Sequence, residues 1–152
     1  MRFFHQGQFE GRTKRISPHL SRAPVEPIDR DLSDFYERLL AVLRQPAFRD
    51  WQWQLLEPTP GWDGNWTHDY FLAFAWQGGA GDRFVVAANY APNQSQCHVR
   101  LPFPDLGGKK WCFKDQLSPA VYDWNGDDLD ARGLFLDMAP WQACVFSVTN
   151  CR

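Results

Sequence analysis

The feature of the sequence that most constrains its fold is a change in the spacing of apolar residues near residue 51. Before it, in DLSDFYERLLAVLRQP, apolar residues recur every three or four positions, which is typical of an amphipathic helix. After it, short segments alternate apolar and polar side chains, a period typical of half-buried β-strands. The alternating segments are WQWQLL, YFLAFAW, FVVAANY, CHVRL, KKWCFKD, GLFLDM and ACVFSV.

The connections between these segments are short and rich in glycine, proline and asparagine. Short strands joined in this way favour an antiparallel sandwich or barrel, so we predict a mainly β protein with an antiparallel β-sandwich over residues 51–152. Asn125-Gly126 is predicted to be a simple turn with acidic flanks. A calcium loop is the alternative, but Gly126 is at the fourth position counted from Asp123, and an EF-hand needs glycine at the sixth.

Residues 1–50 are predicted to hold three elements. Arg2 to His5 form a short buried strand, residues 6–30 form a long irregular loop, and an amphipathic helix follows. Asp31 is expected to cap that helix, and Pro46 to end it. A loop as long as residues 6–30 is uncommon in a compact domain and indicates a functional or docking segment.

Composition and motifs exclude several classes of function. The 152 residues carry a formal net charge of −2, which gives no general attraction to nucleic acid or to anionic membranes, and no apolar stretch has membrane length. The four histidines do not have metal-ligand spacing, and no phosphate-binding loop occurs, so the sequence predicts no metal and no cofactor. No C-x-x-C pair occurs, which favours reduced thiols in a cytoplasmic protein. The cysteines are Cys97, Cys112, Cys144 and Cys151.

The segment GWDGNW places two indoles beside polar groups. Trp62 and Trp66 could stack on the apolar face of a sugar while Asp63 and Asn65 bind its hydroxyls. Alternatively, they close one end of the sandwich, since apolar residues beside a turn commonly fold back onto a core. Both readings stay open at this point.

The N-terminal segment MRFFHQGQFEG resembles the last barrel strand of the α-amylase family of glycoside hydrolases. Gly7 and Gln8 match the glycine and the following residue of the turn that ends that strand. The chain departs from the family at His5 and Gln6, where tyrosines are common, and at Phe9, where an acid is usual. Glu10 is offset by one position.

The resemblance extends along the rest of the chain. GRTKRISPHLSRAPVEPIDRDLSDFYERLLAVLRQPAFRDWQWQLL resembles the family's closing loop, eighth helix and following strand, and RFVVAANYAPNQSQCHVRLP resembles a strand pair of its C-terminal sandwich. The resemblance implies that residues 1–50 are the end of a (β/α)8 barrel, with its last strand, loop and last helix. Residues 51–152 would be the C-terminal antiparallel β-sandwich domain of a sucrose- or starch-processing enzyme.

The resemblance also implies what the chain does. The family's catalytic carboxylates lie on the fourth and fifth barrel strands, with a supporting aspartate after the seventh, and all three positions would lie upstream of Met1. We therefore expect no catalytic residue here and a sandwich that stabilises the upstream catalytic barrel, whose substrate would be an α-glucan or another oligosaccharide. His5, Gln8 and Arg12 are candidate contributors to a sugar site at the strand end. Phe3 and Phe4 would pack in the barrel, so we expect the chain alone to self-associate.

An alternative of another class is a free-standing carbohydrate-binding or interaction module. It predicts surface indoles at Trp62, Trp66 or Trp124 that bind soluble glucans.

Overall fold

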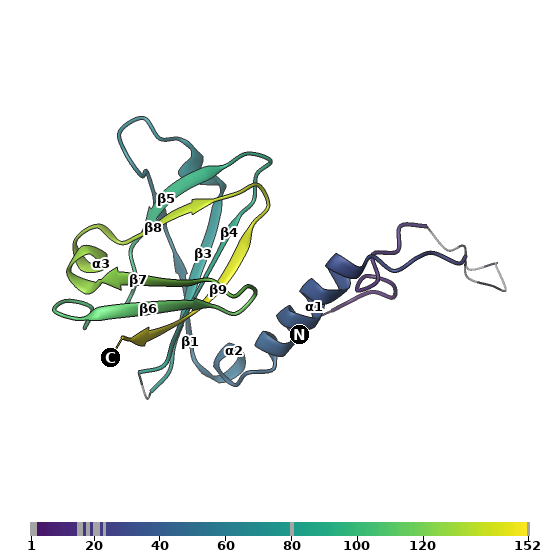
Figure 1. The fold of residues 1–152 in the computed structure, drawn as a ribbon, viewed down its shortest axis with the longest axis horizontal. Coiled ribbons are helices and arrows are strands. Elements are labelled where there is room, and N and C mark those ends of the chain that lie inside the picture. The colour runs from purple at the N-terminus through teal and green to yellow at the C-terminus, as the bar shows by residue number, and fades with distance from the viewer. Residues whose placement is uncertain are drawn as a thin grey trace. The chain divides into compact units, whose positions relative to one another are not determined.

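A computed structural model describes residues 3–14, 17, 19, 22, 24–79 and 81–151. The chain divides into two compact units, Met1–Arg44 and Gln45–Arg152, which are described separately (Figure 1). None of the helices in the described residues is long and apolar enough to cross a membrane.

The first unit contains the predicted amphipathic helix, α1 (Arg30–Leu43). Its cap is Asp29 and not the predicted Asp31, because Asp29 has an extended backbone and its side chain accepts a hydrogen bond from the Leu32 amide at 3.0 Å. Asp31 lies instead in the first turn, where its charge suits the positive end of the helix dipole.

The predicted strand at Arg2–His5 is wrong for the residues that the structure describes. Phe3 to His5 have no regular secondary structure, and the Phe3 side chain is 82% exposed. Arg2 lies outside the described residues. The physical reason is that a strand needs a neighbour to accept its ladder hydrogen bonds, and the described part of this unit offers none.

The second unit holds all of the described strands. Helix α2 (Ala47–Asp50) begins directly after Pro46. The remaining elements follow in chain order: β1 (Gln52–Leu56), β2 (Pro58–Thr59), the 3-10 helix η1 (Thr67–Tyr70), β3 (Phe71–Gln77), β4 (Arg83–Asn89), β5 (Ser95–Val99), β6 (Lys110–Asp115), β7 (Val121–Asn125), α3 (Gly126–Arg132), β8 (Leu134–Met138) and β9 (Ala143–Asn150).

These strands form two antiparallel sheets, with orders β1-β3-β4-β9-β6-β7 and β2-β5-β8 (Figure 1). Strands make up 35% of the structure and helices 20%, so the predicted mainly β, antiparallel class is confirmed. The core lies between the sheets, because alternate residues of each strand point inward. Its fully buried members come from both sheets and include Val85, Phe113 and Val148 from the larger one and Val99 and Leu134 from the smaller one.

The Asn125-Gly126 prediction of a simple turn is wrong. Asn125 ends β7 and caps α3, with its side-chain oxygen accepting a hydrogen bond from the Asp127 amide at 2.8 Å. Gly126 is the first residue of the helix and is buried. The pair therefore joins a strand to a helix, and the acidic residues after it occupy the helix's first turn, where they are favoured.

Candidate functional site

The first candidate group, His5, Gln8 and Arg12, lies on a tight turn in the first unit. Gly7 has a φ of 86°, a conformation that favours glycine, and its carbonyl accepts a hydrogen bond from the Arg12 amide at 3.0 Å. The Gln8 side chain accepts from the His5 amide at 3.3 Å and donates to the Tyr36 hydroxyl at 2.8 Å. The turn thus brings His5 and Gln8 together, while the side chains of His5 and Arg12 are exposed.

A cluster of rings supports this turn. The Phe9 ring lies 5.1 Å from Phe4 and 5.0 Å from Tyr36, measured between centroids. Phe9 stands where the α-amylase family usually has an acid, and here it packs against α1 rather than offering a carboxylate. The Gln8 side chain is already hydrogen-bonded to the His5 amide and the Tyr36 hydroxyl, and the His5 Nδ1 lies 3.2 Å from the Gln6 carbonyl oxygen. The groups left for a ligand are therefore the His5 Nε2 and the Arg12 guanidinium.

The second candidate pair, Trp62 and Trp66, is separated by the fold. Buried Asn65 accepts a hydrogen bond from the Gly61 amide at 3.1 Å and donates to the Thr67 hydroxyl at 2.9 Å, which fixes the loop between the two indoles. The Trp66 ring packs edge-on against Tyr70, with centroids 5.5 Å apart. Both indoles are more than half exposed, but Trp62 lines a surface hollow whose lining does not include Trp66.

Trp62 lines a hollow of about 400 Å³ at the surface of the second unit. Its aromatic walls come from distant parts of the chain: the loop before η1, strand β5, strand β7 and strand β8. Such a combination of flat rings and a shallow opening suits a planar or sugar-like ligand. The lining residues are Gly61, Trp62, His98, Trp124, Asp128, Arg132, Gly133 and Phe135.

Polar groups meet the rings in this aromatic hollow. Arg132 donates to the Asp128 carboxylate at 2.9 Å, and both side chains are more than half exposed. The His98 ring packs against Phe135 at 5.1 Å, and its Nδ1 is buried without a hydrogen-bond partner in the described structure. A carboxylate, a guanidinium and an imidazole beside apolar rings can bind the hydroxyl groups and the apolar face of a sugar.

The sequence predicts Trp62 as a sugar-binding residue, and Trp124 only if the chain is a free-standing binding module. It does not predict the other residues that line the hollow. The alternation of Cys97, His98 and Val99 predicts that the His98 side chain faces solvent, but it is half-buried. The sequence predicts Asp128 as an acidic flank of the Asn125-Gly126 turn and assigns no role to Arg132. Their spacing of four residues is the signal that could have found them, since it suits an ion pair on one turn of a helix.

The two buried cysteines are not candidate nucleophiles. Burial raises the pKa of the Cys97 thiol to about 12. Burial, together with the nearby charge of Asp115, raises the pKa of Cys144 to about 11. A thiol attacks as its thiolate, so both side chains serve as core residues at neutral pH.

Comparison with known proteins gave structural neighbours alone. No family model matches the sequence, and no curated protein matches it either. Among solved structures, the trehalulose synthase MutB from Pseudomonas mesoacidophila, an α-amylase-family glycoside hydrolase, aligns with a TM-score of 0.47 and 18% identity over 78% of this chain. A variant of MutB in complex with its substrate sucrose gives the same values. The chain spans 18% of the length of these neighbours, and likeness of this size does not assign it to a family.

Proposed function

We propose that this chain is the non-catalytic C-terminal part of an α-amylase-like glycoside hydrolase acting on α-glucans. In this proposal, residues 1–50 complete the catalytic barrel, and the β-sandwich of residues 51–152 packs on that barrel and stabilises it. The order of one amphipathic helix followed by an antiparallel sandwich supports the proposal. His5, Gln8 and Arg12 are the residues that it assigns to the edge of the barrel's sugar site.

The observation that carries the proposal is an apolar outer face on the larger sheet. Trp53 is 56% exposed, Leu55 61% and Leu72 52%. Trp53 is paired with Trp76 and Leu55 with Phe74, so their side chains lie on one face of the sheet. Large contiguous apolar surfaces of this kind mark interaction sites. We define the outer apolar face as Trp53, Leu55, Leu72, Phe74 and Trp76.

Helix α2, at the start of the second unit, packs against one end of the outer apolar face. The Phe48 ring lies 4.8 Å from Trp76 and 4.9 Å from Phe84, which are neighbours on the outer side of β3 and β4. The segment leading into the sandwich is therefore anchored beside the outer apolar face. That location suits contact with a domain encoded upstream.

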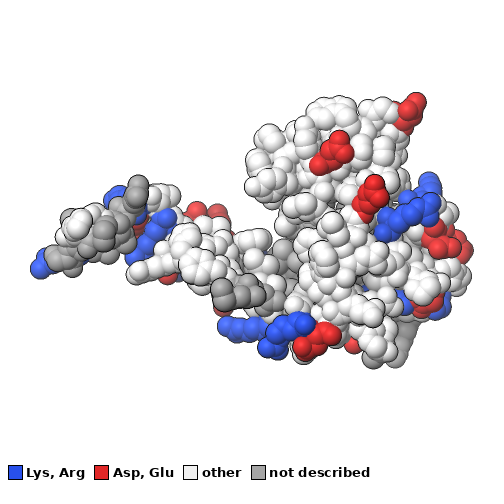
Figure 2. All heavy atoms as spheres, turned by 180° about the vertical axis from the view of Figure 1, so that it is seen from behind, with Lys and Arg blue, Asp and Glu red and all other residues white. Residues whose placement is uncertain are grey.

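The distribution of charge is compatible with such a contact. In the view of Figure 2, wide areas of the surface carry uncharged residues, and the charged groups lie in scattered clusters of both signs. The net charge of −2 is small, so repulsion would not oppose docking.

The outer apolar face predicts that the chain alone self-associates. Trp53→Glu is expected to raise the dimer dissociation constant at least about tenfold, because it places a charge in the contact. Sedimentation velocity over a range of protein concentrations measures this. Val121→Glu is the matched control, since Val121 is 53% exposed on edge strand β7 and should leave association unchanged. A monomeric wild type, or hydrolysis of soluble starch by the purified chain, would contradict the proposal.

A second candidate function, a carbohydrate-binding module, is favoured by the aromatic hollow. Trp62 and Trp124 lie on it together with the Asp128–Arg132 pair and His98. This function does not require an upstream barrel. It requires that soluble glucans reach the hollow and change the environment of its indoles.

The hollow predicts which tryptophan matters. Titration with maltooligosaccharides is expected to change tryptophan fluorescence, and Trp62→Ala should weaken binding by about 1–2 kcal/mol, roughly 5–30-fold, through lost ring stacking. Trp66→Ala is the matched control, because Trp66 is 62% exposed but lies outside the hollow. Equal losses of glucan affinity in the two variants would refute the assignment of binding to the hollow. If the fluorescence of the wild type does not respond to glucans, the carbohydrate-binding function is contradicted and the barrel-stabilising function is favoured.

A further inference from the structure

Three potential metal ligands, two from neighbouring strands and one just beyond the end of a third, meet on one face of the larger sheet. Cys112 lies in β6 and Asp123 in β7, and the two are directly paired in register. Cys151 follows the end of β9, and its amide donates to the Lys110 carbonyl at 2.9 Å. The two sulfur atoms and a carboxylate oxygen of Asp123 all lie within 4.8 Å of one another. Cys112 and Cys151 are half-buried and Asp123 is exposed, so an ion from solvent can reach them.

We propose that Cys112, Asp123 and Cys151 bind a thiophilic divalent cation of the zinc type, with a water molecule as the fourth ligand. Zinc takes thiolate sulfur at about 2.3 Å and carboxylate oxygen at about 2.0–2.2 Å in a tetrahedron. These bond lengths require about 3.8 Å between two thiolate sulfurs and about 3.6 Å between a sulfur and an oxygen. The Cys151 Sγ lies 3.6 Å from Asp123 Oδ1.

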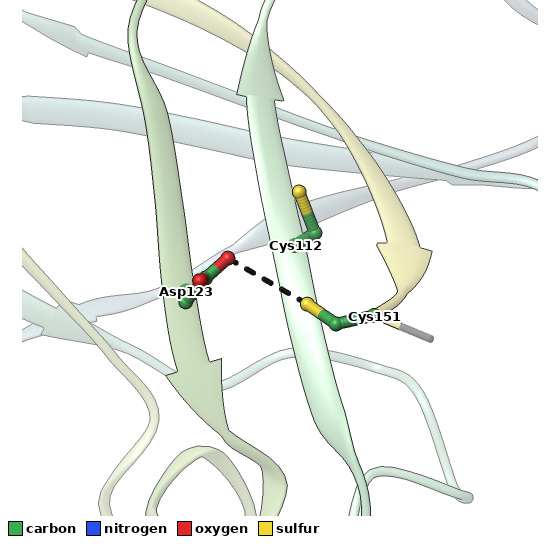
Figure 3. Close-up of side chains that lie close together, drawn as sticks. All are labelled: Cys112, Asp123 and Cys151. Carbon is green, nitrogen blue, oxygen red and sulfur yellow. Dashed lines mark hydrogen bonds between the residues drawn. The ribbon is translucent and has the colours of Figure 1, made fainter.

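The remaining adjustment is small. Figure 3 shows the side chains of Asp123 and Cys151 pointing toward each other, while the sulfur of Cys112 points away from them. A rotation about the Cα–Cβ bond of Cys112 to another staggered position moves that sulfur, and the backbone strands stay in place. The two sulfur atoms lie within 4.8 Å of each other, so they need to approach by no more than about 1 Å.

The charge of the cluster suits a cation. Asp123 brings a carboxylate beside the two thiols. Cysteine binds a metal ion as its thiolate, so binding releases the protons of the thiols, and the negative charges of the ligands offset that of the ion.

A disulfide fits the same residues less well. The direct partner of Cys112 in the ladder is Thr149, and Cys151 lies opposite Lys110, so the two cysteines are diagonal neighbours. Diagonal positions in an antiparallel pair are about 7–8 Å apart, whereas disulfides usually join Cα atoms about 4.4–6.8 Å apart. A metal ion spans the longer distance without moving the strands.

The site would fasten the end of β9 to β6 and β7. Cys151 lies just beyond the last residue of β9, where a strand end otherwise frays. Sequence spacing could not indicate the site, because residues 112, 123 and 151 are far apart and become neighbours through the pairing of three strands.

The test is titration of the reduced, metal-free chain with Co²⁺ and then with Zn²⁺. We expect one equivalent of Co²⁺ to give the thiolate-to-cobalt absorption of two thiolates, and one equivalent of Zn²⁺ to remove it. Cys112→Ser and Cys151→Ser should each halve or abolish that absorption. Asp123→Asn should keep it while weakening Zn²⁺ binding at least about tenfold.

The control is Cys144→Ala, which removes a thiol on the inner side of the same sheet and should leave the cobalt spectrum unchanged. Near-ultraviolet circular dichroism of the tryptophans verifies that each variant is folded. A folded wild type that shows no two-thiolate spectrum overturns the proposal. So does a spectrum that persists in Cys112→Ser, or a disulfide mapped between Cys112 and Cys151 whose reduction restores no metal binding.

Discussion

Replacing Asn89 by aspartate is expected to lower the free energy of unfolding by about 4 kcal/mol at neutral pH. Asn89 ends β4 and is 1% exposed. Its side-chain amide donates to three carbonyl oxygens, of Asn93 at 2.8 Å, Ala139 at 2.9 Å and Met138 at 3.2 Å. Aspartate has nearly the same shape but no N–H group, so a buried negative charge would face three acceptors.

The effect of Asn89→Asp should depend on pH. Burial and the facing carbonyls raise the pKa of the introduced carboxyl in the folded state above its unfolded value of about 3.9. Below that unfolded value both states are neutral, and the charge penalty is absent. The destabilisation therefore grows as pH rises from the unfolded pKa toward the folded pKa.

Urea denaturation of wild type and variant, at neutral pH and at a pH below the usual aspartate range, measures this difference. Asn150→Asp is the matched control, because Asn150 is exposed at the end of β9 and should change stability by less than about 0.5 kcal/mol. If Asn89→Asp stays within about 1 kcal/mol of the wild type at neutral pH, the Asn89 amide does not join Asn93 to residues 138–139 as the hydrogen bonds indicate.

Asn89 illustrates how far the sequence alone could predict the fold. The apolar period on either side of residue 51 predicted α1 and the strands that became β1, β3, β4, β5, β6, β8 and β9. Those predictions succeeded because a half-buried strand and a half-buried helix each leave a periodic pattern. The position of Asn89 after an apolar run can also be read from the sequence. Its three carbonyl partners cannot, since two of them are about fifty positions away.

The elements that were missed carry weaker patterns. Strand β7 has exposed or half-buried residues throughout, so no alternation reveals it. Helix α3 begins with glycine and has only seven residues, and its acidic sequence resembles a turn. Because β7 and α3 supply Trp124, Asp128 and Arg132, the aromatic hollow could not be assembled from sequence. The same edge strand supplies Asp123 to the cysteine cluster, which explains why that cluster was also missed.

Replacing Gly126 by alanine is expected to cost at least about 4 kcal/mol of stability, because it pushes two backbone segments apart. Gly126 starts α3, and its amide donates to the Lys109 carbonyl at 2.8 Å. A Cβ at this position would lie 1.8 Å from the Leu106 carbonyl oxygen and 2.8 Å from that of Lys109. Both obstacles are backbone atoms, so no side-chain rotation relieves the contact.

Graded controls separate this contact from a general effect of removing glycine. Gly79→Ala meets nothing within 4 Å and should stay within about 0.5 kcal/mol of the wild type. Gly107→Ala meets only the Asp127 carboxylate, at 3.3 Å, which can move aside, so its cost should fall between the two. Thermal and urea unfolding rank the three variants by stability.

Because α3 carries Asp128 and Arg132, Gly126→Ala should also distort the aromatic hollow, whereas Gly79→Ala should leave any glucan response intact. If Gly126→Ala were as stable as Gly79→Ala, α3 would not be in close contact with residues 106–109. That result would also contradict the position described for Asp128 and Arg132 in the aromatic hollow.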